Sequence, residues 1–191
     1  MTRSTKLLIA ALAVVLLFGV SGCDQTKDAN AAIEAANVQA QAYTELDNQI
    51  STLMDDASAV TMTPAGVKPG IAALDAATAK FEERKVVIAA VKAEFEKIGA
   101  YDVKEQVKEY AKQQVEIANL LGQIDDLGIK LIADTKALYG MIESGSTDGA
   151  KAEALSTAIE DTSQKLTDLD AQVTEKESAS SKYFTDQGLG K

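Results

Sequence analysis

The chain has 191 residues, with 19 basic and 29 acidic side chains, one cysteine, and neither histidine nor tryptophan. A net charge of −10 opposes binding to nucleic acid and to anionic polymers. Without histidine the chain lacks the commonest acid–base group and metal ligand at neutral pH, and a single cysteine excludes an intramolecular disulfide. We therefore expect no catalytic residues, no metal site, no cofactor and no nucleic-acid partner.

The first part of the chain is typical of an export signal. Arg3 and Lys6 precede an apolar run of 14 residues, from Leu7 to Val20. As a helix this run would be about 21 Å long, against about 30 Å for the hydrocarbon core of a bilayer. That length is short for a stable membrane span and suits the apolar region of a signal peptide. The alternative is an uncleaved anchor followed by an incidental thiol.

The segment Val20-Ser21-Gly22-Cys23 resembles the bacterial lipobox. In that class the cysteine receives a diacylglycerol thioether, the chain is cut just before it, and further fatty acid such as palmitate is added. The resemblance implies that Val20 fills an apolar subsite of the signal peptidase and that the small residues Ser21 and Gly22 admit the enzyme to the backbone. Two or more acyl chains on Cys23 would hold the protein to a membrane nearly permanently.

Cleavage at this point would leave one extracytoplasmic domain, residues 23–191, on the outer side of the cell membrane. Loss of residues 1–22 removes Arg3 and Lys6 and no acid, so 17 basic and 29 acidic side chains remain, a net charge of −12. In some two-membrane bacteria an aspartate at the position of Asp24 keeps a lipoprotein on the inner membrane. The sequence leaves open how many membranes the host has.

The mature chain is rich in helix-forming residues and has no alternating apolar pattern of the kind that predicts strands. Apolar residues recur in steps of three and four, which predicts helices at about residues 27–57, 70–98, 102–143 and 148–186. The expected fold is all-α, an elongated antiparallel helical bundle or coiled coil of three to four long helices. The sequence leaves open whether the second and third helices are continuous.

The breaks between these segments are rich in glycine and proline. Residues 58–70 contain both prolines and predict a loop, which connects two helices or has a function of its own. Residues 99–102 predict a kink or a tight hairpin, in which Asp102 caps the next helix. Residues 143–149 predict a turn in which Thr147 or Asp148 caps the last helix, and residues 187–191 are expected to be a flexible tail.

Two groups of charged residues need a structural explanation. Arg84 lies on the apolar face of the second helix, and we expect its stem to pack while its guanidinium reaches solvent, with a buried ion pair as the alternative. Asp55-Asp56 and Asp125-Asp126 are adjacent carboxylates. Consecutive helical residues point about 100° apart, so these pairs are expected to lie on solvated faces.

Segments of the predicted second to fourth helices resemble the cell-wall-binding lipoprotein family of Gram-positive bacteria. The residues concerned are 81–85 (FEERK), 92–98 (KAEFEKI) and 134–139 (DTKALY), together with the lipobox and the acidic helical tail after Glu153. The resemblance spans about two thirds of the mature chain. It implies association with the cell envelope and no catalytic motif.

The sequence thus predicts a lipid-anchored helical envelope protein, a non-enzyme that acts as an interaction or spacer module. Its expected partners are the membrane, reached through lipid on Cys23, and an envelope protein or the cell wall. An exclusion or immunity lipoprotein that blocks a phage or toxin is an alternative, and a solute-binding lipoprotein is a third. The sequence leaves the oligomeric state open.

Overall fold

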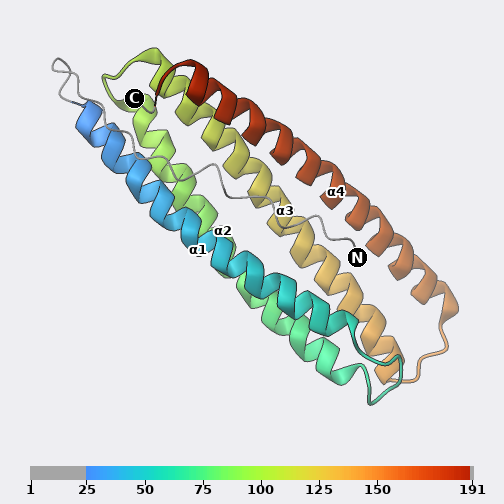
Figure 1. Cartoon of the computed structure of the whole chain (residues 1–191). Helices are drawn as coiled ribbons and strands as arrows, with labels where there is room; N and C mark the ends of the chain where they lie inside the picture. The colour runs from blue at the N-terminus through green and yellow to red at the C-terminus, as the bar shows by residue number, and fades with distance from the viewer. Residues whose placement is uncertain (1–24, 190–191) are drawn as a thin grey trace. The chain divides into compact units, whose positions relative to one another are not determined.

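The computed structural model describes residues 25–189, which form four α-helices packed against one another in chain order (Figure 1). The helices are α1 (Thr26–Ser58), α2 (Lys68–Ala100), α3 (Glu105–Glu143) and α4 (Gly149–Asp186). Within the described part of the chain there is no strand. The prediction of an all-α helical bundle is confirmed.

The start of α2 and the start of α4 follow from local sequence. Pro69 is the second residue of α2, a position at which its missing N–H group costs no helical hydrogen bond. Asp148 precedes α4, and its Oδ1 atom accepts a hydrogen bond of 3.0 Å from the Lys151 N–H group. This side chain therefore caps α4.

The second and third helices are separate. Tyr101–Lys104 interrupt them, and the Tyr101 N–H group donates to the Ile98 carbonyl to end α2. The third helix begins at Glu105, three residues after the predicted start. Asp102 is thus outside α3, and its N–H group donates to the side chain of Gln25.

Both α3 and α4 are followed, two residues after their last residue, by a glycine in the left-handed conformation, Gly145 and Gly188. After α4, Gly188 has φ of 63°, the Gly188 N–H group donates to the Thr185 carbonyl, and the Leu189 N–H group donates to the Phe184 carbonyl. This is the Schellman arrangement, in which the residue after the glycine commonly packs back on the helix. Leu189 is accordingly buried, at 3% exposure. The expectation of a flexible tail is therefore wrong for residues 187–189.

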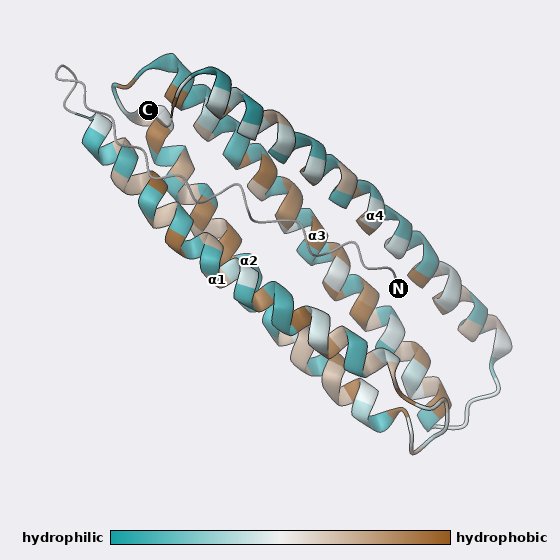
Figure 2. Ribbon diagram, in the orientation of Figure 1, coloured by the Kyte–Doolittle hydropathy of each residue, from teal (hydrophilic) through white to brown (hydrophobic). Residues whose placement is uncertain are grey.

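The chain divides into two compact units. Of the described residues, unit 1 takes 25–44, Val86–Gly122 and 171–189, and unit 2 takes Glu45–Lys85 and Gln123–Asp170. Each unit takes a segment from all four helices. Hydrophobic and hydrophilic residues are interspersed along every helix (Figure 2). The buried hydrophobic residues gather in one large cluster in unit 1 and another in unit 2.

The core of unit 1 combines small residues of α1 with aromatic residues of the other helices. Its cluster includes the α1 residues Ala29, Ala32, Ile33 and Ala36, the α2 residues Phe95 and Ile98, Val103 of the α2–α3 turn, the α3 residues Val107, Tyr110 and Ala111, and Leu189 after α4. The Phe95 and Tyr110 rings meet edge to face, 6.2 Å apart. The alanines are buried because they let the neighbouring helices approach α1 closely.

The core of unit 2 is built by α1, α2, α3 and the α1–α2 connection. Its buried members are Ile50, Ala57, Val67, Leu74, Ala77, Phe81, Ile132 and Tyr139. Among the described residues, α4 contributes no member to this cluster. In unit 2 the only α4 side chain that is fully buried among those described is the polar Thr162.

Candidate functional site: a buried arginine–aspartate cluster

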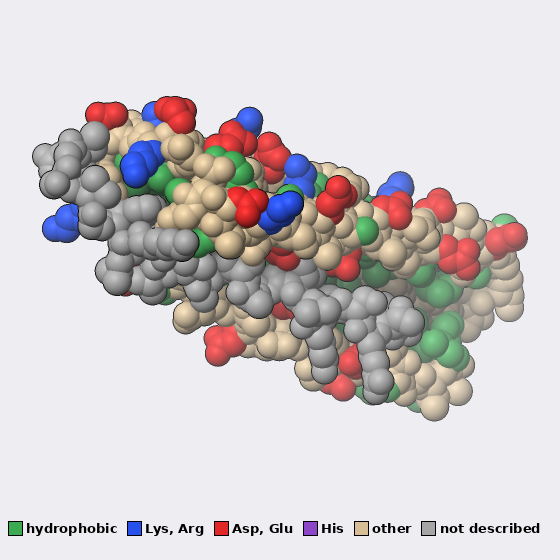
Figure 3. Space-filling model, turned by 45° about the horizontal axis from the view of Figure 1, so that its top comes forward, with side chains coloured by type: hydrophobic (Ala, Val, Ile, Leu, Met, Phe, Trp, Pro, Cys, Tyr) green, Lys and Arg blue, Asp and Glu red, His purple; other side chains and the backbone are tan. Residues whose placement is uncertain are grey.

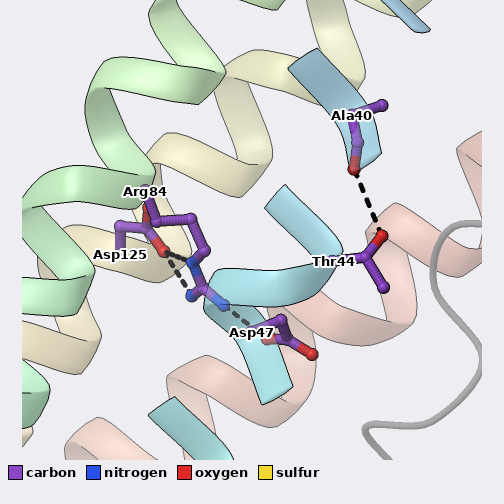
Figure 4. A network of polar contacts seen from close by, with 5 residues as sticks. All are labelled: Ala40, Thr44, Asp47, Arg84 and Asp125. Carbon is purple, nitrogen blue, oxygen red and sulfur yellow. Dashed lines mark hydrogen bonds and ion pairs between the residues drawn. The ribbon is translucent and has the colours of Figure 1, made fainter. Parts of the chain in front are cut away.

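Unit 2 buries an arginine between two aspartates. Arg84 is on the face of α2 that also carries Phe81, so the helical repeat directs its side chain inward. Asp47 comes from α1 and Asp125 from α3 (Figure 4). The side chain of Arg84 is 3% exposed, that of Asp125 is 0% exposed, and that of Asp47 is 24% exposed. Three helices thus bring charge into a position that elsewhere in the core is apolar.

The guanidinium of Arg84 bridges the two carboxylates. Its Nε atom donates to Asp125 Oδ1 over 2.9 Å, and one terminal nitrogen donates to the same oxygen. The other terminal nitrogen donates to Asp47 Oδ1. The Arg84 Cζ atom also lies 4.8 Å from the centre of the Phe81 ring, within the range of a cation–π contact.

Phe81 is itself held in place by a glycine. A Cβ atom built on Gly128 would lie 2.5 Å from Phe81 Cε1, which is closer than real Cβ atoms approach. Only glycine at this position of α3 leaves room for the ring. Gly128 therefore supports Arg84 indirectly, by admitting the aromatic ring on which the guanidinium rests.

The cluster holds more negative than positive charge. Two carboxylates face one guanidinium, and Asp125 Oδ2 is buried with no hydrogen-bond partner in the described structure. Burial raises the pKa of Asp125 to about 6, although Arg84 acts to lower it, and the nearby Asp47 and Asp126 carboxylates add to the rise. Burial also raises the pKa of Asp47, against the lowering effect of Arg84.

A third carboxylate reaches the same region from α4. Asp170 adds to the rise in the pKa of Asp47, and burial raises its own pKa. All three acidic groups in this part of unit 2 therefore hold a proton more tightly than they would in water. Replacing a buried ion pair by apolar residues often leaves stability unchanged, whereas removing one partner is costly. We therefore expect the cluster to favour one alignment of α1, α2 and α3 and to make the stability of unit 2 depend on pH.

The surface charges next to this cluster have ordinary partners. Asp126 is 66% exposed and pairs with Lys85 at 2.8 Å. The prediction that Asp125-Asp126 lies on a solvated face is right for Asp126 and wrong for Asp125. The expectation that the Arg84 head reaches solvent is also wrong, and the buried pairing that we had kept as the alternative is what the structure has.

A sequence signal for this cluster did exist. Asp125 is in step with Leu121, Gly128 and Ile132, which puts it on a second apolar stripe of α3. An arginine on one seam and an aspartate on another are complementary, and each alone would be costly to bury. The sequence pattern treats Arg84 and Asp125 one helix at a time, so it does not predict that they pair across helices.

A second buried polar contact lies in unit 1. The amide of Gln114 in α3 donates to the Ser180 hydroxyl of α4 over 2.8 Å. Close by in sequence, Lys176 pairs with Glu116 at 2.6 Å on the surface. Both contacts join α3 to α4, so polar groups as well as Val173 hold α4 in unit 1.

The α1–α2 connection, residues 59–67, is an ordered segment. The Thr63 hydroxyl accepts a hydrogen bond from the Gly66 N–H group over 3.1 Å, and the Thr63 carbonyl accepts one from the Val67 N–H group. Val67 is fully buried at the base of this segment, whereas Met62 is 60% exposed. The segment connects two helices in a defined conformation and presents one large apolar side chain, Met62, to solvent.

The predicted lipid attachment site lies outside the described residues. Cys23, and the signal peptidase residues Val20, Ser21 and Gly22, all precede Gln25, where the described chain begins. Among residues 25–189, no helix is both long enough and apolar enough to cross a membrane. The same residues contain no group of three or more acidic, cysteine or histidine side chains that could hold a metal ion.

Comparison with protein-family models, with curated proteins and with solved structures gave no match. The resemblance to the cell-wall-binding lipoprotein family therefore stays a prediction.

Proposed function

We propose that this protein is a lipid-anchored helical protein of the cell envelope that acts as an interaction or spacer module on the extracytoplasmic side. The observation that carries the proposal is Val20-Ser21-Gly22-Cys23, placed directly after a basic start and a 14-residue apolar run. The cysteine of this motif is the only one in the chain, so it has no intramolecular disulfide partner.

The described structure is compatible with a folded domain that starts almost at the anchor. The first helix begins at Thr26, three residues after Cys23, and Ala29 is already buried in the core of unit 1. Acidic and basic side chains are spread over the face seen in Figure 3, and the mature chain would be strongly acidic. Such a surface favours solubility and opposes direct binding to anionic wall polymers. The proposal therefore favours a protein partner over the wall polymer itself.

Membrane fractionation of cells expressing tagged variants tests the proposal. We expect the wild-type protein in the membrane fraction, resistant to extraction by high salt, because acyl chains hold it through apolar contact. Cys23→Ala should lack acyl chains and keep residues 1–22. The matched control is Ser21→Ala, which replaces one small residue by another next to the cut and should behave as wild type.

Two outcomes would contradict the proposal. In one, the wild-type protein and Cys23→Ala are both found in the soluble fraction. In the other, both variants stay in the membrane with identical length, which would indicate an uncleaved apolar anchor.

A further inference from the structure

Three parts of the chain converge at one end of unit 1. The side chain of Gln25, just before α1, accepts a hydrogen bond from the Asp102 N–H group in the α2–α3 turn. Leu189, just after α4, shares the core cluster with Ala29 of α1 and Val103 of the turn. We call residues 25–28, 97–105 and 186–189 together the turn face.

The turn face is also where the predicted anchor enters. Cys23 is three residues before Thr26, and three residues of extended chain span about 10 Å at most. Because Gln25 is bound to the turn and Ala29 to the core, the chain cannot swing far from this face without breaking those contacts. Acyl chains on Cys23 would therefore hold the turn face within a short distance of the bilayer surface.

The turn face has a small net charge and a half-buried tyrosine. Its described residues include three basic side chains, Lys27, Lys97 and Lys104, and four acidic ones, Asp28, Asp102, Glu105 and Asp186. Its net charge is therefore −1, so anionic headgroups repel it only weakly. Tyr101 is half-buried in the turn, and tyrosine is enriched at the membrane–water interface.

We propose that the turn face of unit 1 docks end-on against the lipid bilayer that carries the Cys23 acyl chains. This inference rests on the proposed function, because without the lipid nothing brings the turn to the membrane. It adds an orientation: the ends of α2 and α4 and the starts of α1 and α3 face the bilayer, and the exposed sides of the unit 1 helices face the aqueous phase.

Fluorescence quenching in vesicles tests the orientation. The full-length lipidated protein is reconstituted in vesicles of phosphatidylcholine with a minor share of phosphatidylglycerol. A single introduced cysteine carries an environment-sensitive dye, and lipids with a nitroxide near the headgroup act as quencher. The Cys23 sulfur is a thioether in the lipidated protein, so only the introduced thiol is labelled.

Three positions in unit 1 form a matched set. Gly99 is in the last turn of α2, and a Cβ atom at this position would meet nothing within 4 Å. Gly122 of α3 is equally open and is 17 residues after Glu105, about 26 Å along the helix. Val38 of α1 is 60% exposed and is 12 residues after Thr26, about 18 Å along the helix.

We expect the dye at Gly99→Cys to be quenched several-fold more strongly than the dyes at Gly122→Cys and Val38→Cys. Strong quenching at Gly122 or Val38 as well would mean that the unit lies flat, and weak quenching at all three would mean that it floats on a loose tether. Either result overturns the orientation. A mass spectrum of the same preparation shows whether Cys23 carries lipid, which separates failure of the orientation from failure of the anchor.

Discussion

The interiors of the two units differ in composition. In unit 1 the segments of all four helices meet in an apolar cluster, in which alanines of α1 admit the rings of Phe95 and Tyr110. In unit 2 the apolar cluster is built by three helices, and the Arg84 cluster occupies part of the interior. Unit 2 also has 17 acidic and 8 basic side chains, whereas unit 1 from Cys23 onward has 12 and 9.

The difference teaches that apolar and ionic interiors respond to different perturbations. An apolar core loses stability when volume changes and is indifferent to pH. A buried cluster with excess negative charge loses stability when its cation is removed and gains stability when a carboxylate takes up a proton. Hydrogen exchange of amides in each unit can measure these responses separately.

The largest expected effect is that of Arg84→Met in unit 2. Methionine keeps much of the apolar stem and leaves Asp47 and Asp125 facing each other without a cation. We expect the free energy of opening of unit 2 at neutral pH to fall by about 3–5 kcal/mol, as for other buried pairs that lose one partner. This free energy can be measured by denaturant titration in which hydrogen exchange of the unit 2 amides is monitored. Lys85→Met, at the exposed neighbouring position, is the control and should change little.

A smaller effect is expected from pH. The pKa of Asp125 in the folded protein is about 6, against 3.8 for the ordinary group, and the pKa values of Asp47 and Asp170 are raised as well. Between about pH 4 and 6 the folded state therefore binds more protons than the unfolded chain, so the free energy of unfolding increases as pH falls through this window. Unit 2 should be more stable at pH 5 than at pH 7.5, by an amount on the order of 1–3 kcal/mol.

Adjacent aspartates provide the control for this pH effect. Asp125→Asn removes the buried titrating group and should abolish most of the pH dependence of unit 2 stability. Asp126→Asn removes an exposed carboxylate and should leave that pH dependence in place. An equal pH dependence in the two variants would contradict the assignment to Asp125, as would a wild-type unit 2 that becomes less stable from pH 7.5 to 5.

Alanine substitutions at two glycines of α3 should change the stability of unit 2 in opposite directions. Gly128→Ala forces a methyl group against the Phe81 ring, and overpacking of this kind costs about 1–3 kcal/mol. Gly140→Ala, in the same helix and the same unit, meets nothing within 4 Å and should stabilise by up to about 1 kcal/mol, because alanine favours the helix. Thermal unfolding of the two variants checks the contrast, and equal shifts would contradict the close packing of Phe81.

The smallest expected effect concerns Tyr139. Its hydroxyl donates to the Ala57 carbonyl over 2.8 Å and ties the end of α1 to α3. Tyr139→Phe keeps the ring in the core and removes this bond, so unit 2 should lose about 1 kcal/mol and the amides at the end of α1 should exchange faster. No change in exchange near Ala57 would show that the bond does not hold the end of that helix.

The helical architecture was predictable because it follows from local information. Steps of three and four placed the four helices, and glycine and proline marked the connections, so the predicted ends differ from the observed ones by three residues at most, at Glu105. Residues 187–189 were misjudged for a local reason too. The expectation of a flexible tail did not allow for Gly188, which forms the turn that returns Leu189 to the core.

The buried cluster was not predictable in the same way. Arg84 is 37 residues from Asp47 and 41 from Asp125, and their contact depends on how three helices slide along one another. Periodicity fixes the face of a helix and leaves its axial position open. The Arg84 anomaly was visible in the sequence, but its two partners required the helices to be placed.

The most direct test of the anchor is a mass spectrum of the intact protein purified from its native membranes. We predict a chain that begins at Cys23 and carries a diacylglycerol group on its sulfur, so that residues 1–22 are absent. A product with a free thiol at Cys23 and the leader still attached would contradict the account.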